Sequence, residues 1–353
     1  MVYQCSNYEF EDVIGQVDAA DLLAPSLPEE TRLIRLGRRA VNKARRSLNL
    51  LAGMTMTMNP VTVDRKYDLF FAVFLFPAEV LYLNKVQGWR EQAKQAACFL
   101  GEVWTKDAAL LRQYSPLLRQ FDHIFLHIGA SVSLVESVIG RPCHLIRVGV
   151  DAIRFCPYPD PPARVVDCYS FGRRSKPVHE ALLKLTGERR FFYLFDTVNN
   201  FAVNDPTEHR RMTAEIIKRS RYFTAFKHNL NASHLTGGDE AMGARHFEGT
   251  AGGTVMVGVA PATPEFDQVF NWEDALIPIP FDAQDMGSIL AELDAQPARL
   301  ERARRNNVLG ALRRHDWGHR WGTILEVMGL PPLPGLAERK NRLESLARLA
   351  ESG

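Results

Sequence analysis

The sequence has no excess of charge of either sign. Its 353 residues include 43 Lys and Arg against 41 Asp and Glu, which gives a formal net charge of +2. Proteins that bind nucleic acid use a strongly basic surface to neutralise phosphates, and this chain has no such surplus. We therefore exclude nucleic acid as its partner.

Paired cysteines and long apolar runs are also missing. None of the five cysteines forms a C-x-x-C pair, which excludes the usual zinc and thioredoxin-type patterns, and their odd number fits a reducing compartment. The most apolar stretch, 69–83, is 15 residues long and contains Pro77 and Glu79, whereas a bilayer needs about 20 apolar residues. The chain does not begin with the pattern of a secretory leader, so we predict a cytoplasmic protein.

The length of the chain predicts two domains, since a domain usually has roughly 100–200 residues. Four prolines between 157 and 162 cannot continue a helix or a central strand, and they mark the expected linker. We predict an N-terminal domain at 1–157 and a C-terminal domain at 158–330. A last charged helix within 331–353 is expected to pack back toward the N-terminal domain.

Short apolar runs alternate with helical patterns on both sides of the linker, as in α/β domains with parallel sheets. The strands expected in the first domain are 2–5, 20–24, 69–74, 97–101, 123–127 and 144–148. Those expected in the second are 165–171, 191–195, 222–226, 254–259 and 275–279. Doubly wound sheets bind ligands at the carboxyl ends of their strands, so a cleft between two such domains is the expected site.

The segment 237–258 is rich in glycine and carries Glu240 and Glu248 with seven residues between them. We expect Glu248 in the first turn of a helix over 245–251 that ends at Gly252 and Gly253. A carboxylate there can accept hydrogen bonds from ligand hydroxyls, and small neighbours let ligand oxygens approach N–H groups at the helix N-terminus. The alternative is a first-turn glutamate favoured by the helix dipole, with a glycine C-cap.

Four segments match a known family in the right order. They are Arg245-His-Phe-Glu248 with Gly253 and Thr254, then His315-Asp-Trp317, the hinge-like Gly149-Val-Asp151 with Phe155 and Pro157, and Gly172-Arg-Arg-Ser-Lys176 after an expected strand. In these segments the sequence resembles the group 1 (family 4-like) GT-B glycosyltransferases, especially the bacterial branch with R-x-F-E and H-D-W motifs.

The resemblance implies an α/β protein of the GT-B class, with two facing Rossmann-like, doubly wound domains and an interdomain cleft. It implies transfer of a sugar from a nucleotide-sugar donor to an acceptor, with retention of the anomeric configuration. Arg173 or Arg174, with Lys176, would bind the donor diphosphate, unless the three form only a solvated basic turn. Glu248 would hold the ribose hydroxyls, and Glu240 would lie near the sugar. The implied donor site also includes Arg245, Gly252 and Gly253.

The resemblance also implies catalysis without a metal or other cofactor. In retaining relatives the leaving diphosphate takes the acceptor proton, and the charges of Arg173 and Lys176 would stabilise it. No D-x-D pair at an expected strand end is placed to hold a divalent ion.

The first domain departs from the family pattern, because it has neither the glycine-rich loop nor the usual histidine. Its expected strand 97–101 ends at Glu102, which is a candidate general base for the acceptor hydroxyl or only an exposed glutamate beside Trp104. His127, at the end of the next expected strand, is the alternative.

The acceptor is not specified by the sequence, and a glycan, a natural product and a lipid are all compatible with it. Residues 32–46 hold seven basic side chains and no acidic one, with apolar residues at helical spacing. Such a helix could contact anionic lipid and make the protein membrane-peripheral, or it could be a solvated surface helix that balances the acidic start of the chain.

Two other functions compete with glycosyl transfer. A non-catalytic GT-B homologue would bind a nucleotide sugar or glycan as a partner or regulatory subunit, and the departures in the first domain favour it. A nicotinamide-dependent oxidoreductase would need a G-x-G-x-x-G segment after a strand, which the sequence lacks.

Overall fold

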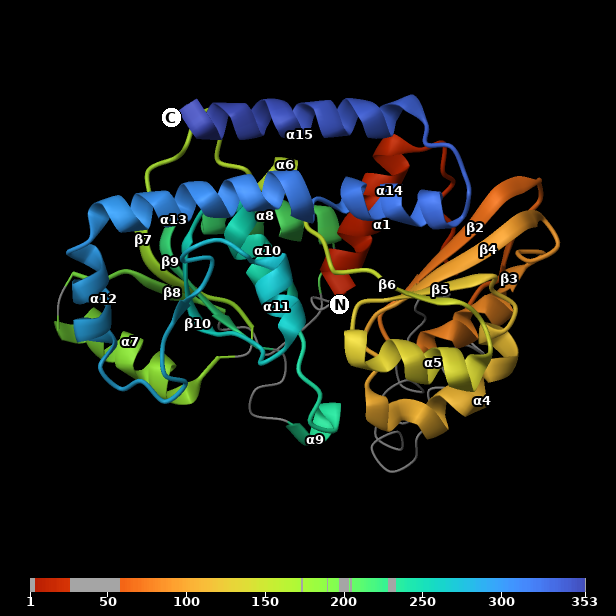
Figure 1. Ribbon diagram of the computed structural model, residues 1–353, viewed down its shortest axis with the longest axis horizontal. Coiled ribbons are helices and arrows are strands. Elements are labelled where there is room, and N and C mark those ends of the chain that lie inside the picture. The colour runs from red at the N-terminus through yellow and green to blue at the C-terminus, as the bar shows by residue number, and fades with distance from the viewer. Residues whose placement is uncertain are drawn as a thin grey trace, which may run out of the picture. The chain divides into compact units, whose positions relative to one another are not determined.

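The computed structural model of the protein describes residues 4–25, 58–172, 174–188, 190–196, 203, 205–227 and 233–352. The chain forms two compact units (Figure 1). The larger unit comprises Met1–Ala20 and Arg147–Gly353, and the smaller unit comprises Asp21–Ile146. The boundary therefore differs from the predicted division after residue 157, because the start of the chain and the segment 147–157 both pack with the C-terminal part.

The larger unit is built on a sheet of five parallel strands. In chain order they are β7 (Val166–Ser170), β8 (Tyr193–Phe195), β9 (Ser220–Phe226), β10 (Val255–Val259) and β11 (Ile277–Pro278). Their order in the sheet is β11-β10-β9-β7-β8, so the chain moves outward from β7 to β8 and then returns to place β9 on the other side of β7. This reversal makes the carboxyl ends of β7 and β9 the switch point, where sheets of this type bind ligands.

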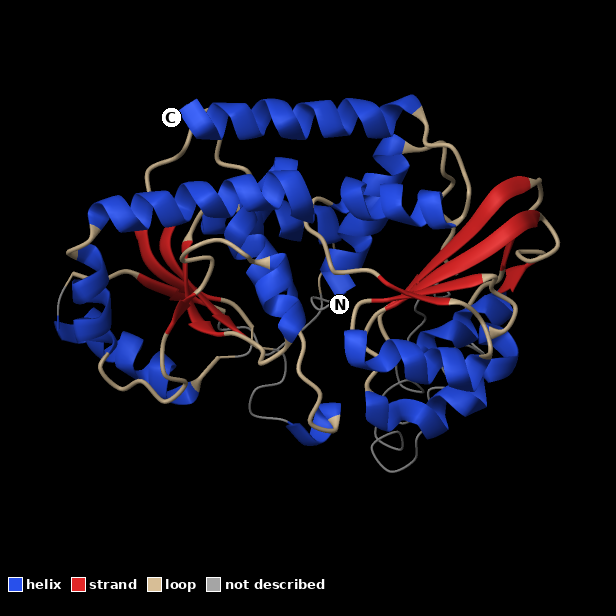
Figure 2. Ribbon diagram, in the orientation of Figure 1, coloured by secondary structure: helices blue, strands red, loops and turns tan. Residues whose placement is uncertain are grey.

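Helices cover both faces of this sheet (Figure 2). On one face α7 (Lys176–Glu188) and α12 (Met286–Asp294) share a core with Cys168 of β7 and Tyr222 of β9. On the other face α8 (Pro206–Lys218), α10 (Ala244–Ala251) and α13 (Pro297–Gly310) pack on Tyr169 and Phe223. Adjacent strand residues thus point to opposite cores, which explains why these strands carry apolar side chains at successive positions.

The first helix that the structure describes is α1 (Cys5–Val17), where the sequence predicted strands. The strand predicted at 2–5 is wrong at residues 4 and 5, which are helical, while 2 and 3 lie outside the described residues. Residues 20–24 form no strand. The buried residues of α1 recur at helical spacing: Cys5, Glu9, Phe10, Val13, Ile14 and Val17. The apolar residues of this segment recur with a period of about 3.6, which predicts a helix, but the charged Glu9 interrupts that pattern.

The C-terminal part of the chain is helical, as the sequence predicted. After α13 come a π-helical turn (Ala311–His315), α14 (Trp317–Val327) and α15 (Pro334–Ser352). Helix α15 packs on α1, α13 and α14, all within the larger unit. Its buried Arg339 donates hydrogen bonds to Asp151 at 2.6 Å and to Asp316 at 2.7 and 2.8 Å.

The smaller unit contains a four-stranded parallel sheet whose order follows the chain. Its strands are β2 (Tyr67–Phe74), β4 (Ala93–Leu100), β5 (His123–Leu126) and β6 (Cys143–Leu145), with a separate pair formed by β1 (Val61–Thr62) and β3 (Val86–Gln87). The helical segments are η2 (Pro77–Lys85), η3 (Thr105–Asp107), α4 (Ala108–Leu118), η4 (Gly129–Ser131) and α5 (Val132–Ile139). The four strands predicted between 69 and 148 are thus present, each with at least one shifted end.

Two observations bear on the predicted membrane contact. The basic segment 32–46 lies outside the described residues. Among the helices that the structure does describe, none is both long and apolar enough to cross a membrane.

A buried histidine predicts how stability depends on pH. Burial, followed by the charge of Arg320, holds the pKa of His315 well below its ordinary value near 6.5. The folded protein therefore keeps His315 neutral, while the unfolded chain takes up a proton as the pH falls through about 6.5. We expect the free energy of unfolding to decrease between about pH 7.5 and 5.5, and to decrease less in His315→Asn.

Urea unfolding at both pH values measures this difference, with the exposed His234→Asn as the matched control. An equal pH dependence in His315→Asn and the unaltered protein would show that protonation of His315 does not oppose folding.

Candidate active site

At the switch point of the larger sheet, a hydrogen bond between buried side chains joins two neighbouring strands. Ser170, the last residue of β7, lies 2.6 Å from Thr224 of β9, hydroxyl to hydroxyl, and both side chains are buried. The chain leaves the sheet through Phe171 and Gly172 after β7, and through Lys227 after β9. Side chains at these exits form the floor of the expected ligand site.

Arg245, the second residue of α10, reaches across the exit of β7. Its Nε donates a hydrogen bond to the carbonyl oxygen of Phe171, and its guanidinium carbon lies 5.8 Å from the centre of that ring. Gly172 has a φ of +71°, and a Cβ there would collide with the Arg245 guanidinium. Glycine is therefore favoured at 172 by its backbone conformation, and it also leaves room for the Arg245 side chain that passes over it.

Glu240 and Lys227 form an ion pair at the exit of β9. Glu240 also accepts a hydrogen bond of 2.6 Å from the backbone N–H of Ala262, which follows β10. Burial would raise the pKa of Glu240, but the hydrogen bonds from Lys227 and Ala262 outweigh it and hold that pKa below its ordinary value. The carboxylate is thus ionised and remains 27% exposed, while Lys227 is 22% exposed.

Lys227 was missed by the sequence analysis, although a signal for it existed. It follows the predicted strand 222–226 directly, and the same strand-end argument that selected 173–176 applies to it.

The basic turn after β7 is only partly available to a ligand. Arg174 forms an ion pair with Asp196, donates to its carbonyl oxygen at 3.0 Å and lies 5.3 Å from the centre of the Phe195 ring. Lys176 is 83% exposed and lies 3.8 Å from Glu180 on the surface of α7. Arg173 lies outside the described residues. Arg174 is therefore held beside β8, whereas Lys176 projects into solvent.

Glu248 lies deeper than the sequence predicted. It is the fifth residue of α10, so its expected place in the first turn is wrong. It is 3% exposed, its Oε1 accepts a hydrogen bond from Arg210, and its buried Oε2 has no partner among the described residues.

Arg210 links Glu248 to the first helix of the chain. Its Nε and Nη2 each donate a hydrogen bond of 3.0 Å to the carboxylate of Glu9, which also accepts from the Asp151 N–H at 3.0 Å. Burial raises the pKa of Glu9 and the charge of Arg210 opposes that rise. Arg210 of α8 thus pairs with a buried carboxylate of α1 and another of α10, while Oε2 of Glu248 keeps no partner among the described residues.

Gly252 and Gly253 lie at the opposite end of α10 from its N-terminus, which corrects the expectation that they admit ligand oxygens there. A Cβ at Gly252 would collide with Ile217, and one at Gly253 would lie 2.7 Å from Cγ2 of Val308. Arg164 donates to the carbonyl of Gly253 at 2.7 Å. The two glycines allow close packing at the C-terminal end of α10, as the C-cap alternative predicted.

Glu102 belongs to the smaller unit. It follows β4 as predicted, its side chain is half-buried, and its backbone N–H donates to the carbonyl of Leu75. His127 follows β5 in the same unit, with its ring 6.1 Å from that of Phe99. Within the described parts of the chain, no group of three or more His, Cys, Asp or Glu side chains is arranged to hold a metal ion.

Comparisons with known proteins agree with this architecture. Residues 176–326, less than half of the chain, match a family model described as glycosyl transferase-like. No curated protein matches the sequence. The structure is similar to that of Anabaena Alr3699/HepE in complex with UDP and glucose, with a TM-score of 0.51, 13% identity, and coverage of 81% of this chain and 82% of that one.

Two further solved structures match at lower similarity. A glycosyltransferase from Rickettsia africae ESF-5 has a TM-score of 0.46 and 11% identity, covering 88% of this chain and 83% of that one. Trehalose-6-phosphate synthase OtsA has a TM-score of 0.46 and 11% identity, covering 75% of this chain and 72% of that one. The α/β fold of the GT-B class predicted from the sequence is confirmed.

The buried cluster predicts a large loss of stability in Arg210→Met. This substitution keeps most of the side chain's volume but leaves the carboxylate of Glu248 buried without its cation and that of Glu9 with only Arg154, at 3.5 Å. We expect the free energy of unfolding to fall by about 3–5 kcal/mol, measured by urea denaturation at neutral pH. The neighbouring exposed Arg211→Met should change it by no more than about 0.5 kcal/mol. Equal losses in the two variants would contradict a stabilising role for the cluster.

Proposed function

We propose that the protein is a glycosyltransferase that uses a nucleotide-sugar donor, and that the donor binds at the carboxyl ends of β7, β9 and β10. The observation that carries this proposal is the convergence of Arg245, Lys227 and Glu240 on the switch point. All three lie inside the span that matches the glycosyl transferase-like family model. The family-model match and the positions of these three charged side chains both support glycosyl transfer.

The donor diphosphate is proposed to lie between Arg245 and Lys227. A guanidinium and an ammonium at neighbouring strand exits suit a diphosphate, since each can donate charge-assisted hydrogen bonds to its oxygens. Helix α10 begins at Gly243, where the space that a Cβ would occupy is open, so ligand oxygens can approach its first N–H groups. Arg173, Arg174 and Lys176 remain candidates for additional phosphate contacts.

Glu240 is proposed to bind the transferred sugar. Its ionised carboxylate can accept hydrogen bonds from sugar hydroxyls, and a diphosphate that approaches Lys227 would compete for the cation that Glu240 holds. Transfer would proceed with retention, and the leaving diphosphate would take the acceptor proton while Lys227 and Arg245 stabilise its charge. Glu102 is the proposed acceptor-orienting residue of the smaller unit.

Glu248 is proposed to act chiefly as a positioning residue. The resemblance assigns it to the ribose hydroxyls, but its unpartnered Oε2 is buried, so that contact would require its neighbours to move. Through Arg210 it fixes α10, and α10 in turn holds Arg245 over Gly172. Glycan, natural product and lipid all remain candidate acceptors.

The second candidate is a non-catalytic homologue that binds a nucleotide sugar or glycan. The observation that favours it is that Arg174 and Glu248, two of the donor residues implied by the resemblance, are already ion-paired within the protein. Slow hydrolysis of a donor without acceptor would support the enzyme, whereas saturable binding without turnover would support the binding protein.

The first test compares Lys227→Ala with Lys184→Ala, an exposed lysine on α7. We expect Lys227→Ala to lower kcat/KM for donor hydrolysis by about 100-fold or more, because it removes a cation from the leaving phosphate. Lys184→Ala should retain the original rate. UDP-glucose is the first donor to assay, because the similar Anabaena structure holds UDP and glucose.

Thermal shifts with UDP-, GDP-, ADP- and dTDP-sugars would identify the base. A donor at a hundredfold excess over Kd should stabilise the protein by about 2.7 kcal/mol. Retained turnover in Lys227→Ala would place the diphosphate elsewhere.

The second test concerns metal dependence. We expect turnover to continue at the same rate in EDTA, because the proposed site stabilises the diphosphate with protein cations alone. Initial rates are measured after chelation and after adding back Mg²⁺ or Mn²⁺. Loss of activity in EDTA that Mn²⁺ restores would contradict this prediction and leave the donor site itself in place.

A further inference from the structure

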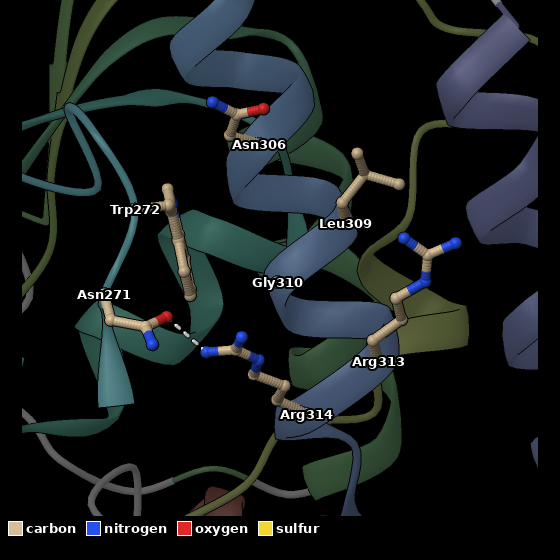
Figure 3. A pocket seen from close by; sticks show the side chains of 7 residues that line it. All are labelled: Asn271, Trp272, Asn306, Leu309, Gly310, Arg313 and Arg314. Atoms are coloured by element: carbon tan, nitrogen blue, oxygen red, sulfur yellow. Dashed lines mark hydrogen bonds between the residues drawn. The ribbon is translucent and has the colours of Figure 1, made fainter. Parts of the chain in front are cut away.

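A polar pocket lies in the larger unit, away from the strand exits (Figure 3). Its volume is about 340 Å³. One wall is formed by Asn271 and Trp272, which lie between α11 (Pro264–Val269) and β11, and thus precede a strand rather than follow one. The other wall is formed by α13 and the π-helical turn, through Asn306, Leu309, Gly310, Arg313 and Arg314.

Trp272 is held rigidly in this pocket. Its indole N–H donates to the side-chain oxygen of the buried Asn307 at 2.8 Å. A Cβ at Gly310 would lie 2.6 Å from Cζ2 of the indole, so only glycine lets the ring lie against α13. The indole remains partly exposed toward the pocket. A fixed, partly exposed aromatic face binds apolar ligand surfaces at a low cost in conformational entropy.

The charge of the pocket is positive. None of its seven lining residues is acidic. Arg314 donates to the side-chain oxygen of Asn271 and lies 5.9 Å from the centre of the Trp272 ring, and among the described residues it has no carboxylate partner. Arg313 differs, because Glu344 and Glu351 of α15 already pair with it. Arg314 is therefore the cation available to a ligand.

The π-helical turn brings these groups together. It begins directly after Gly310 and contains both Arg313 and Arg314. A π turn next to an α-helix is rare and is frequently found at functional sites. In Figure 3 Arg314 projects toward Asn271 and Trp272 on one side of this turn.

We propose that this pocket binds one acidic sugar unit of a glycan, separately from the donor site. The flat indole would contact the apolar face of the sugar ring, the amides of Asn271 and Asn306 would bind hydroxyls, and Arg314 would bind a carboxylate or phosphate. A volume near the lower limit of ligand pockets suits one unit rather than several. The proposal rests on the proposed function, because it takes the glycan to be part of the acceptor. A pocket that binds one unit of the acceptor would raise its effective concentration near the enzyme.

Calorimetric titration with three probes tests the proposal: glucuronic acid, glucose 6-phosphate and glucose. We expect saturable binding of at least one acidic sugar, about tenfold or more tighter than that of glucose. The better of the two acidic probes identifies the anionic group. Arg314→Ala should abolish the preference, while Arg302→Ala, an exposed arginine of α13 outside the pocket, should retain it.

Further variants separate this site from the donor site. Trp272→Phe should weaken binding of all three sugars, because a smaller ring covers less of the sugar face. Lys227→Ala should leave binding of the acidic sugar unchanged. If this variant loses donor turnover but still binds the acidic sugar, the donor site and the sugar pocket are separate sites. Absence of saturable binding, equal affinity for glucose, or tighter binding of UMP than of either acidic sugar would overturn the proposal.

Discussion

The larger unit depends on the pairing of Arg210 with two buried carboxylates. Glu9 comes from the first helix of the chain and Glu248 from the middle of α10. Arg210 pairs with both carboxylates, and Arg154 lies 3.5 Å from Glu9 as a second cation. Asp151 lies at the edge of the cluster, where its N–H donates to Glu9 and its carboxylate accepts from Arg339 of α15. One polar network thus joins both ends of the chain to the hinge-like segment and to the helix that carries Arg245.

The network bears on which charged groups belong to the proposed donor site. Glu248 pairs with Arg210 and Arg174 with Asp196, whereas Arg245, Lys227 and Glu240 lie at the strand exits. Arg245 is positioned by the packing of α10, and Glu240 by Lys227 and the backbone of Ala262. The proposed site is therefore made from groups held at strand exits, which is where doubly wound sheets bind ligands.

Much of this arrangement was predictable from the sequence, because apolar runs bounded by polar turns identify parallel strands well. The five strands of the larger sheet and helix α10 were predicted from such patterns. The strand order was not, since pairing between distant segments leaves no local trace. Lys227, by contrast, directly follows a predicted strand and could have been selected by its position at the strand end. Glu248 was placed in a first turn because the helix start at Gly243 has no side-chain cap to mark it. The buried ion pair of Glu9 with Arg210 could not be predicted, because a glutamate among apolar residues interrupts the helical pattern of the sequence.

The division of the chain has a consequence for any attempt to study the parts in isolation. The smaller unit, Asp21–Ile146, is an insertion between α1 and the rest of the larger unit, so the chain passes between the two units twice. Cutting at the proline-rich linker would remove both α1 and Asp151 from the C-terminal piece. It would strip Arg210 of Glu9 and Arg339 of one of its two acidic partners. An intact larger unit requires a graft instead: α1 would have to be joined directly to the segment that begins at Arg147.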